Sequence, residues 1–188
     1  MPPGKLIYLL NASLDGYVET PDHSLDWTKV DDELHTWFND QIRGLDALIY
    51  GRRTYELMAS YWPTAESDVA ATAPVREFAR LWCALPKIVL SRSLGAVEGN
   101  SRLLRDGVGD AFTRIRQEFS GDLVVGGPTL AASFIERGLV DEYRLVVHPV
   151  ILGAGTPFFP RLDRRVPLRL IETRRFDSGA VFLSFAAH

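Results

Sequence analysis

The apolar residues of this chain gather in short continuous runs, and these runs predict buried strands. A run without polar alternation is typical of a strand that is covered on both faces, as in a parallel sheet. Runs of strand length span residues 5–11, 47–50, 87–90, 123–125 and 142–150, and a shorter strand is expected at 102–104.

Between these runs the apolar residues recur at intervals of three or four positions, which predicts helices packed against the sheet. Over 31–42 the residues Leu34, Trp37 and Ile42 share one helical face, and Asp31 suits the N-cap position. The same spacing predicts further helices over 52–60, 74–84, 110–119 and 128–137.

The end of the chain has a different pattern. Residues 168–176 and 180–186 alternate between apolar and polar side chains around a turn at 177–179, which predicts an antiparallel pair. Strands that alternate with helices and end in such a hairpin predict an α/β fold, a three-layer sandwich with a mainly parallel central sheet. The segments 12–21, 61–73, 95–109 and 151–167 are expected to be loops, and Trp62-Pro63 opens the second of them.

Length and composition narrow the class of protein. At 188 residues the chain is expected to form a single domain over 1–188 with a sizeable core. Its net charge of −3 argues against binding to nucleic acid or to an anionic membrane. No segment has the length of a membrane span or the apolar region of a signal peptide, so a cytoplasmic location is expected.

Cysteine and histidine do not suggest a metal site. Cys83 is the only cysteine, and it lies in an apolar helical pattern that predicts a buried thiol. The histidines, among them His23, His35 and His148, lack the spacing of zinc ligands, so no metal is predicted. His148 ends a predicted strand and is either a core histidine or a pocket residue.

The most informative local motif is the run from Leu123 to Leu130, in which an apolar strand ends in Gly126-Gly127-Pro128 and a helix follows. Glycine lets the backbone approach an anion closely, the helix N-terminus favours negative charge, and Pro128 suits the first helical turn. The motif therefore predicts a phosphate-binding turn. The alternative is a tight turn between strand and helix that binds no ligand.

Two other predicted strands end in similar groups, the first at 51–54 (Gly-Arg-Arg-Thr) and the second at 91–93 (Ser-Arg-Ser). The carboxyl ends of parallel strands meet at one edge of a sheet, where α/β proteins bind their ligands. Three clusters of backbone N–H, guanidinium and hydroxyl groups at that edge predict a ligand with several phosphates, such as a dinucleotide. Each arginine taken alone is equally compatible with a solvated surface residue.

The loop that follows the first strand, 11–17, belongs to the same edge of the sheet. It contains Asp15-Gly16, and its sequence is compatible with a simple glycine turn or with a flexible loop that closes over a ligand. Five short motifs, taken in chain order, then resemble the dihydrofolate-reductase-like family: Ser13-Leu14-Asp15-Gly16, Gly51-Arg52-Arg53-Thr54-Tyr55, Leu90-Ser91-Arg92-Ser93, Gly126-Gly127-Pro128 and Pro149-Val150-Ile151-Leu152-Gly153.

The resemblance covers nearly the whole chain, and it is greatest to the C-terminal reductase domain of the bifunctional riboflavin-biosynthesis deaminase/reductase. It implies a dihydrofolate-reductase-like fold, NADPH bound across the C-terminal edge of the sheet, and a homodimer. The apolar strand at 143–151 is then expected to contribute to the dimer interface.

The resemblance also implies roles for particular residues. The helix that holds phosphate oxygens would open with Gly51, Arg52, Arg53 and Thr54. The adenosine end, where a 2′-phosphate distinguishes NADPH from NADH, would face Ser91 and Arg92. The pyrophosphate would contact Gly126, Gly127, Thr129 and Leu130. The nicotinamide and its covering loop would lie near Ala12, Asp15, Gly16 and Tyr17.

The proton donor is less sharply defined. Adding a hydride to a C=N or C=O bond requires a proton on the heteroatom, so a carboxyl group or an ordered water is expected. In dihydrofolate reductases a lone carboxylate follows a tryptophan near the start of the first helix, and Asp32 has the matching spacing from Trp27. Asp31 and Glu33 are alternatives, and all three acids also suit the first turn of a helix.

These observations favour an NADPH-dependent oxidoreductase that acts on a small heterocyclic, pterin- or pyrimidine-like, or ribosylamino substrate. The zinc-binding signature of the deaminase half does not occur in the sequence, so the complete bifunctional enzyme is not expected. One alternative is a nucleotide-binding module of the same fold without turnover. Another is a structural domain with a vestigial pocket, against which the retained phosphate donors argue.

Overall fold

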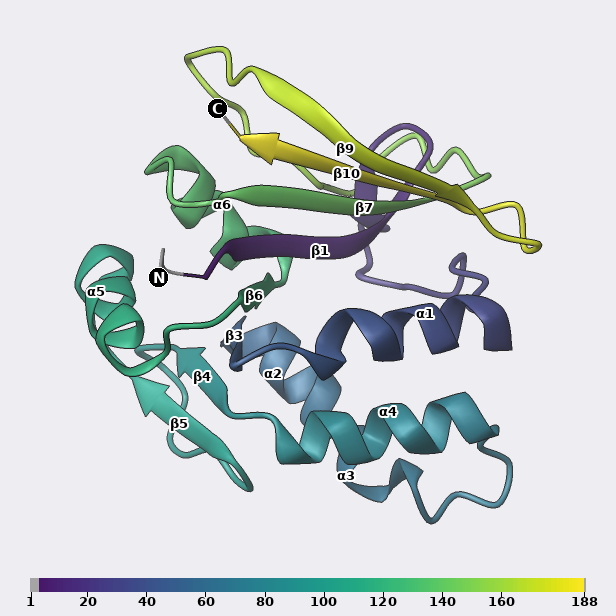
Figure 1. Ribbon diagram of the computed structural model, residues 1–188, viewed down its shortest axis with the longest axis horizontal. Helices are drawn as coiled ribbons and strands as arrows, with labels where there is room; N and C mark the ends of the chain where they lie inside the picture. Colours follow the sequence, from purple (N-terminus) through teal and green to yellow (C-terminus); the bar gives the residue numbers. More distant parts are fainter. Residues whose placement is uncertain (1–3, 188) are drawn as a thin grey trace.

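The computed structural model describes residues 4–187, and its centre is an eight-stranded sheet (Figure 1). The predicted domain, 1–188, also contains residues 1–3 and 188, which lie outside the described residues. The strands of the sheet are β1 (Leu6–Ser13), β3 (Ala47–Gly51), β4 (Lys87–Leu90), β5 (Ser101–Leu104), β6 (Leu123–Gly126), β7 (Glu142–His148), β9 (Leu168–Arg175) and β10 (Val181–Ala187).

The strand order is β5-β4-β3-β6-β1-β7-β10-β9, and every pair from β5 to β7 is parallel. The last two strands form the predicted antiparallel hairpin, with β10 paired to β7 and β9 at the edge. The predicted α/β class, with a mainly parallel sheet closed by a hairpin, is therefore confirmed.

Helices cover both faces of this sheet. They are α1 (Asp32–Arg43), α2 (Arg52–Ala59), α3 (Trp62–Ala65), α4 (Ala73–Ala84), α5 (Val108–Glu118) and α6 (Pro128–Glu136). Side chains of α1, α2 and α4 form one buried cluster with one face of the sheet, while α5 and α6 form a second cluster on the other face. The helices therefore make the outer two layers of the predicted three-layer sandwich.

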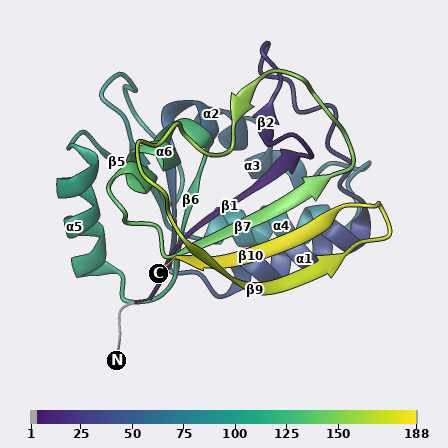
Figure 2. The same ribbon diagram turned by 90° about the horizontal axis from the view of Figure 1, so that it is seen from above.

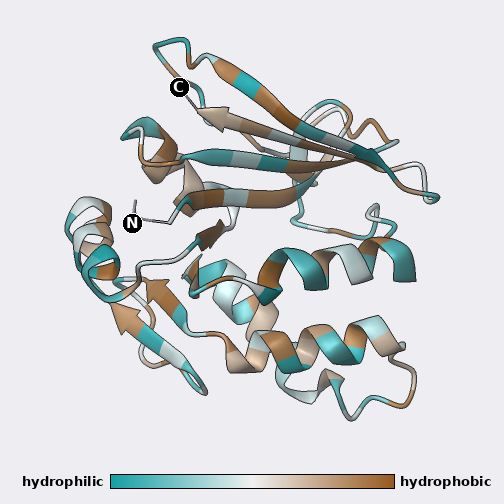
Figure 3. Ribbon diagram, viewed as in Figure 1, coloured by the Kyte–Doolittle hydropathy of each residue, from teal (hydrophilic) through white to brown (hydrophobic). Residues whose placement is uncertain are grey.

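The helix boundaries follow from local chemistry. Asp31 caps α1 as predicted, because its carboxylate accepts a hydrogen bond from the Leu34 amide at 2.9 Å. Leu34, Trp37 and Ile42 are buried on the sheet side of this helix. Figure 3 shows the result as alternating hydrophilic and hydrophobic bands along α1, whereas β6 and the part of β4 that follows Lys87 are mainly hydrophobic.

Two of the predicted loops contain short strands. β2 (Tyr17–Glu19) and β8 (Thr156–Pro157) pair as a separate antiparallel ribbon, so the prediction that 12–21 and 151–167 are entirely loops was wrong. Gly155 makes the pairing possible, because any Cβ at this residue would collide with the carbonyl oxygen of Glu19. The ribbon stands beside the C-terminal ends of β1 and β7 (Figure 2).

Two further expectations need correction. Trp62-Pro63 begins the short helix α3 instead of a loop. Cys83 is exposed, because it lies one position beyond Trp82 and so about 100° around the helix from the buried face. β7 lies between β1 and β10, so both of its edges are paired, and its predicted part in a dimer interface would use a face of the strand. No helix within residues 4–187 combines the length and the apolar character that a membrane crossing requires.

Candidate functional site

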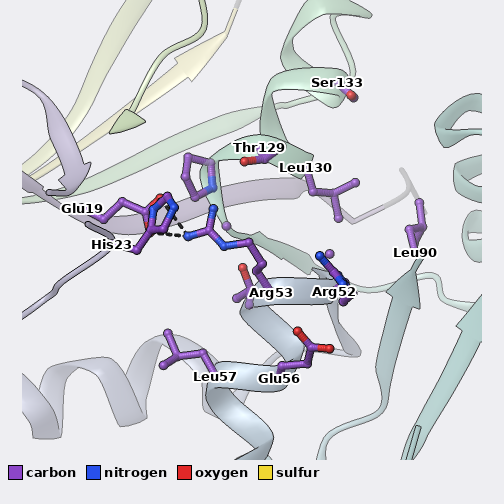
Figure 4. A pocket seen from close by; sticks show the side chains of 14 residues that line it. Glu19, His23, Arg52, Arg53, Glu56, Leu57, Leu90, Thr129, Leu130 and Ser133 are labelled. Atoms are coloured by element: carbon purple, nitrogen blue, oxygen red, sulfur yellow. Dashed lines mark hydrogen bonds and ion pairs between the residues drawn. The ribbon is translucent and has the colours of Figure 1, made fainter. Parts of the chain in front are cut away.

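A cavity of about 600 Å³ opens at the C-terminal ends of β3, β4 and β6, the edge at which the sequence predicts a ligand (Figure 4). Its walls come from the N-terminal turns of α2 and α6, the end of β4 and the segment from β2 to His23. The residues that line it are Glu19, His23, Gly51, Arg52, Arg53, Thr54, Glu56, Leu57, Leu90, Gly127, Pro128, Thr129, Leu130 and Ser133.

Both helices that meet at the cavity begin without a side-chain cap. Gly51 is the N-cap of α2 and Gly127 is the N-cap of α6, and neither can offer a side-chain acceptor to the first amides. The unpaired N–H groups and the helix dipoles therefore make both turns suited to negative charge. A single anion-binding helix end is common, but two that share one cavity favour a ligand with more than one anionic group.

Close packing between the two turns requires the double glycine. Gly127 has a φ of +91°, and a Cβ there would collide with the Thr54 hydroxyl. A Cβ at Gly126 would collide with the ring of Tyr50 on the neighbouring strand. Thr54 therefore packs directly against the turn, and the glycines keep the start of α6 beside the start of α2.

The two arginines at the start of α2 diverge. Figure 4 shows the Arg52 side chain on the side of Leu90, and the Arg53 side chain on the side of Glu19 and the start of α6. Among residues 4–187, the Arg52 guanidinium has no hydrogen-bond or ion-pair partner, so its donors are available to a ligand. Arg53 instead donates from Nη2 to both Glu19 carboxylate oxygens, at 3.0 and 2.9 Å.

Glu19 is the centre of a polar cluster that closes one end of the cavity. Its carboxylate also accepts from Thr156 Oγ1 at 2.6 Å and contacts His23 Nδ1 at 2.9 Å. Burial by itself raises the pKa of Glu19, but the hydrogen bonds from Thr156, Arg53 and His23 outweigh it and lower the pKa overall. The ionised carboxylate can only accept hydrogen bonds, so His23 carries its proton on Nδ1.

The predicted phosphate-binding residues Gly51, Arg52, Arg53, Thr54, Gly127, Thr129 and Leu130 all line this cavity. Gly126 lies just behind it, in β6. Ser91 and Arg92 follow the lining residue Leu90: the Ser91 hydroxyl accepts from the Ser93 and Leu94 amides, and the Arg92 side chain is exposed. Ser91 therefore shapes the turn after β4.

The residues predicted near the nicotinamide lie at the end of β1 instead of in the cavity lining. Ala12 is buried in β1, Gly16 forms the turn with a φ of +86°, and Tyr17 begins β2. Asp15 accepts hydrogen bonds from Ser13 Oγ and from the Leu152 and Gly153 amides, which lowers its pKa and ties this turn to the loop after β7.

Asp32, the candidate proton donor, is exposed on the first turn of α1 and is not among the residues that line the cavity. Its Oδ1 accepts a hydrogen bond from Thr72 Oγ1 at 2.8 Å. The two alternatives also have structural partners, since Asp31 caps α1 and Glu33 binds Arg174 and the Asp177 amide.

A second polar group lies at the ends of β1 and β7. His148 is buried, with Nε2 2.9 Å from Asn11 Oδ1, and burial lowers its pKa so that the ring is neutral. Its Nδ1 accepts from the Lys29 amide at 3.4 Å, so Nε2 carries the proton and donates to Asn11 Oδ1. Within residues 4–187 the amide nitrogen of Asn11 has no acceptor, so it is able to donate to a ligand. Trp27 packs edge-on against the His148 ring.

The opposite end of β4 carries a second cavity, of about 440 Å³. Lys87, which begins β4, is 2% exposed and donates from Nζ to the carbonyl oxygens of Trp82 at 2.7 Å and Cys83 at 3.3 Å. The ammonium thus caps the C-terminus of α4, and it lies 4.3 Å from the centre of the Trp82 ring. Within residues 4–187, no group of three or more metal-ligating side chains is found.

The sequence reasoning did not identify Glu19, His23 or Thr156. Two of the three side chains that contact Glu19 are distant in the sequence, Arg53 by 34 positions and Thr156 by 137. The third, His23, lies four positions away in a loop, where a contact between side chains does not follow from spacing. The structure does mark this segment in one way. His23 has a φ of +66°, the only positive φ outside glycine among the described residues. This conformation turns the ring back over Glu19, and sequence alone does not reveal it.

Comparisons with known proteins agree with this fold. The Bacillus subtilis proteins YyaP and YwjB are 31% and 29% identical to this chain; the matches cover 94% and 93% of it, and 92% and 94% of those proteins. Among solved structures, a riboflavin-biosynthesis protein from Shewanella sp. PV-4 superposes with a TM-score of 0.79 at 21% identity, over 98% of this chain and 99% of that one.

Two better-known enzymes share the fold. The deaminase/5-amino-6-(5-phosphoribosylamino)uracil reductase of Thermotoga maritima superposes with a TM-score of 0.70 at 14% identity, over 99% of this chain and 57% of the enzyme. Dihydrofolate reductase from Enterococcus faecalis, solved with NADP(H), gives 0.64 at 15% identity, over 100% and 98%. The family model described as the RibD C-terminal domain matches residues 4–182, and the chain therefore belongs to that reductase-like family.

Proposed function

We propose that this protein is an NADPH-dependent reductase that transfers a hydride to a small heterocyclic, pterin- or pyrimidine-like, or ribosylamino substrate. The observation that carries the proposal is the convergence of two uncapped helix N-termini and two arginines on one cavity at the C-terminal edge of the sheet. A dinucleotide with an additional 2′-phosphate matches these donors in charge and in number. Membership of the RibD C-terminal domain family supports the reductase assignment.

The donor groups suggest how the cofactor would be held. The amides at the starts of α2 and α6 would bind the pyrophosphate, with Thr129 beside them. Arg52, directed to the side of Leu90, would reach the 2′-phosphate together with Ser91 and Arg92. When bound, the reduced nicotinamide supplies the hydride.

The substrate is proposed to lie at the ends of β1 and β7, beside Trp27 and the Asn11–His148 pair. His148 fixes the orientation of the Asn11 amide, whose nitrogen has no acceptor among the described residues and would donate to a carbonyl or ring acceptor of the substrate. Asp32, or a water held by it, is the proposed proton donor. Replacing Asp32 with Asn should then lower turnover without changing the dissociation constant for NADPH.

The alternative function is a nucleotide-binding module without turnover. It is favoured by one observation, that Asp32 does not line the cavity and already accepts a hydrogen bond from Thr72. The two functions separate in a single assay, in which NADPH oxidation is followed with dihydropterins and ribosylamino-pyrimidines. Tight binding of NADPH without oxidation by any substrate would favour the module.

The decisive test is titration of the protein with NADPH and with NADH, read by nicotinamide fluorescence or calorimetry. We expect NADPH to bind at least about tenfold more tightly, since one charge-assisted phosphate contact stabilises by roughly 1.5–3 kcal/mol. Arg52→Ala and Arg92→Ala should remove this preference while leaving NADH binding almost unchanged. Absence of binding by either dinucleotide would contradict the proposal.

The homodimer stays a prediction. Its interface is proposed on the part of the sheet formed by β7, β10 and β9, on the face where no helix lies in front of these strands in Figure 2. There Leu183 and Phe185 of β10, Leu145 of β7 and Leu170 of β9 are at least partly exposed. Light scattering after gel filtration should give twice the mass of the chain. Replacing Leu183 with Glu should then convert the dimer to a monomer with the same circular dichroism.

A further inference from the structure

Glu19 places a negative charge in a cavity whose helix N-termini and arginines favour the binding of anions. It is 8% exposed, it is ionised, and it lines the same cavity as two uncapped helix N-termini. A carboxylate in that position repels an incoming phosphate, so its presence needs a reason beyond anion binding. Thr156, His23 and Arg53 all hold it in place.

The contact between Glu19 and Arg53 uses only part of the guanidinium. A single nitrogen, Nη2, donates to both carboxylate oxygens, whereas a strong carboxylate–guanidinium pair uses two nitrogens in parallel. Among residues 4–187, Nη1 and Nε of Arg53 have no partner. Another anion is therefore able to replace the Glu19 carboxylate as the partner of Arg53.

The same carboxylate connects separate parts of the molecule. Glu19 lies in β2, Thr156 in β8, and Arg53 at the start of α2. Figure 4 shows the Glu19 and His23 side chains meeting Arg53 at one end of the cavity, opposite Leu90. Glu19 to Arg53 is the only side-chain ion pair from the β2–β8 ribbon to α2 within the described residues.

We propose that Glu19 is a displaceable counter-ion for Arg53: a phosphate group that enters the cavity takes its place, and the β2–β8 ribbon is thereby released from α2. This inference rests on the proposed function, because it concerns the anion that the same cavity would bind. Glu19 then sets the affinity for phosphate ligands by competing with them for Arg53.

The sign of the effect follows from this competition. In the free protein the carboxylate occupies the arginine, so binding of a phosphate must break that ion pair and bring two anions close together. Glu19→Gln removes both costs while keeping the hydrogen bond to Thr156. Because partly exposed ion pairs are worth up to roughly 1 kcal/mol, we expect affinity to rise about fivefold.

The experiment measures dissociation constants for NADPH and for inorganic pyrophosphate with the wild type, Glu19→Gln, Arg53→Gln and the double variant. Glu56→Gln is the matched control, because Glu56 lines the same cavity but its carboxylate has no partner among the described residues. It should tighten binding by less than about twofold. In the Arg53→Gln background no ion pair is left to break and only the repulsion between two anions remains, so Glu19→Gln should tighten binding by less than it does in the wild type. The thermal midpoints show whether each variant is folded.

Hydrogen exchange provides a second readout. In the free protein, amides of the β2–β8 ribbon should exchange faster in Glu19→Gln than in Glu56→Gln. Weaker or unchanged binding by Glu19→Gln, or an equal gain from both variants, would overturn the proposal. If pyrophosphate binds and NADPH does not, the cofactor assignment fails while the counter-ion role is still tested. If neither binds, both fail.

Discussion

The cavities at the two ends of β4 differ in whether their positively charged groups have partners within the protein. At the start of the strand, Lys87 is buried and donates to two carbonyl groups at the C-terminus of α4. At the end of the strand, two helices present their N-termini, Arg52 has no partner within residues 4–187, and Arg53 is only partly engaged. One cavity contains a charge that the protein has satisfied, and the other contains donors that remain available.

The difference shows why cavity volume alone does not identify a binding site. Both cavities are large enough for part of a small molecule, at about 600 and 440 Å³. In the second cavity the partial negative charge at the C-terminus of α4 balances the ammonium of Lys87, so that ammonium does not favour a ligand. Two helix N-termini and two arginines all contribute positive potential to the first cavity, so that cavity favours an anion.

The largest effect is expected from Gly127→Val. The substituted residue would have to keep a φ of +91° and would collide with Thr54, so the turn between β6 and α6 must shift. We expect a loss of about 3 kcal/mol in the free energy of unfolding and no detectable NADPH binding. Chemical denaturation and NADPH titration measure the two effects.

Gly44→Ala serves as the control. Gly44 ends α1 with a φ of −100°, and a Cβ there would meet no atom within 4 Å. Its effect on unfolding should stay within about 0.5 kcal/mol, with NADPH binding intact. Equal tolerance of both substitutions would show that the double glycine is dispensable.

Lys87→Met should affect stability alone. The variant keeps the volume of the side chain but leaves the carbonyl groups of Trp82 and Cys83 without their donor. We expect the free energy of unfolding to fall by about 1–3 kcal/mol and the NADPH dissociation constant to change less than twofold. A large change in NADPH binding would mean that the two ends of β4 are coupled.

The free energy of unfolding should depend on pH through Lys87 in the alkaline range and through Glu19 in the acidic range. Burial lowers the pKa of Lys87 below its ordinary value of 10.5, so the unfolded chain binds the extra proton just below that pH. Stability from this group therefore rises as pH increases toward 10.5. The pKa of Glu19 is lowered below 4.5, so its stabilisation is complete above pH 4.5 and is lost as pH falls through the folded value.

Denaturation curves at several pH values test these signs. The free energy of unfolding is plotted against pH for each protein. The difference between wild type and Lys87→Met gives the contribution of Lys87 at alkaline pH. The difference between wild type and Glu19→Gln gives the contribution of Glu19 at acidic pH. A wild type whose pH dependence matches that of both variants would contradict the assignment.

The smallest effect concerns Cys83. As an exposed thiol at the second cavity, it should react in the native protein with one equivalent of an aromatic disulfide reagent. Saturating NADPH should change the rate less than about twofold, because Cys83 is at the other end of β4. Strong protection by NADPH would place the dinucleotide in the second cavity instead.

Much of the fold was predictable because the relevant patterns are local. Apolar runs identified the parallel strands, and the spacing of Leu34, Trp37 and Ile42 identified the buried face of α1. The start of α6 was recognisable because Pro128, which suits the first turn of a helix, follows an apolar strand and two glycines. The residues at this turn line the cavity as expected.

The remaining features depend on contacts that are distant in the sequence. Glu19 has a role only because β2 pairs with β8, and each of these strands is too short to give a pattern. The position of β7 inside the sheet depends on strand order, which hydrophobic runs do not encode. Exposure of Cys83 depends on the rotation of α4 about its axis, and one residue decides it.

The carboxylate of Asp15 has a mechanical consequence. It accepts the amides of Leu152 and Gly153 as well as the hydroxyl of Ser13, so one side chain fastens the turn after β1 to the loop after β7. The two segments are separated by more than a hundred residues, and the shared hydrogen bonds couple them. We therefore expect the two segments to open together, with the amide protons of Leu152 and Gly153 losing protection from exchange at the same rate.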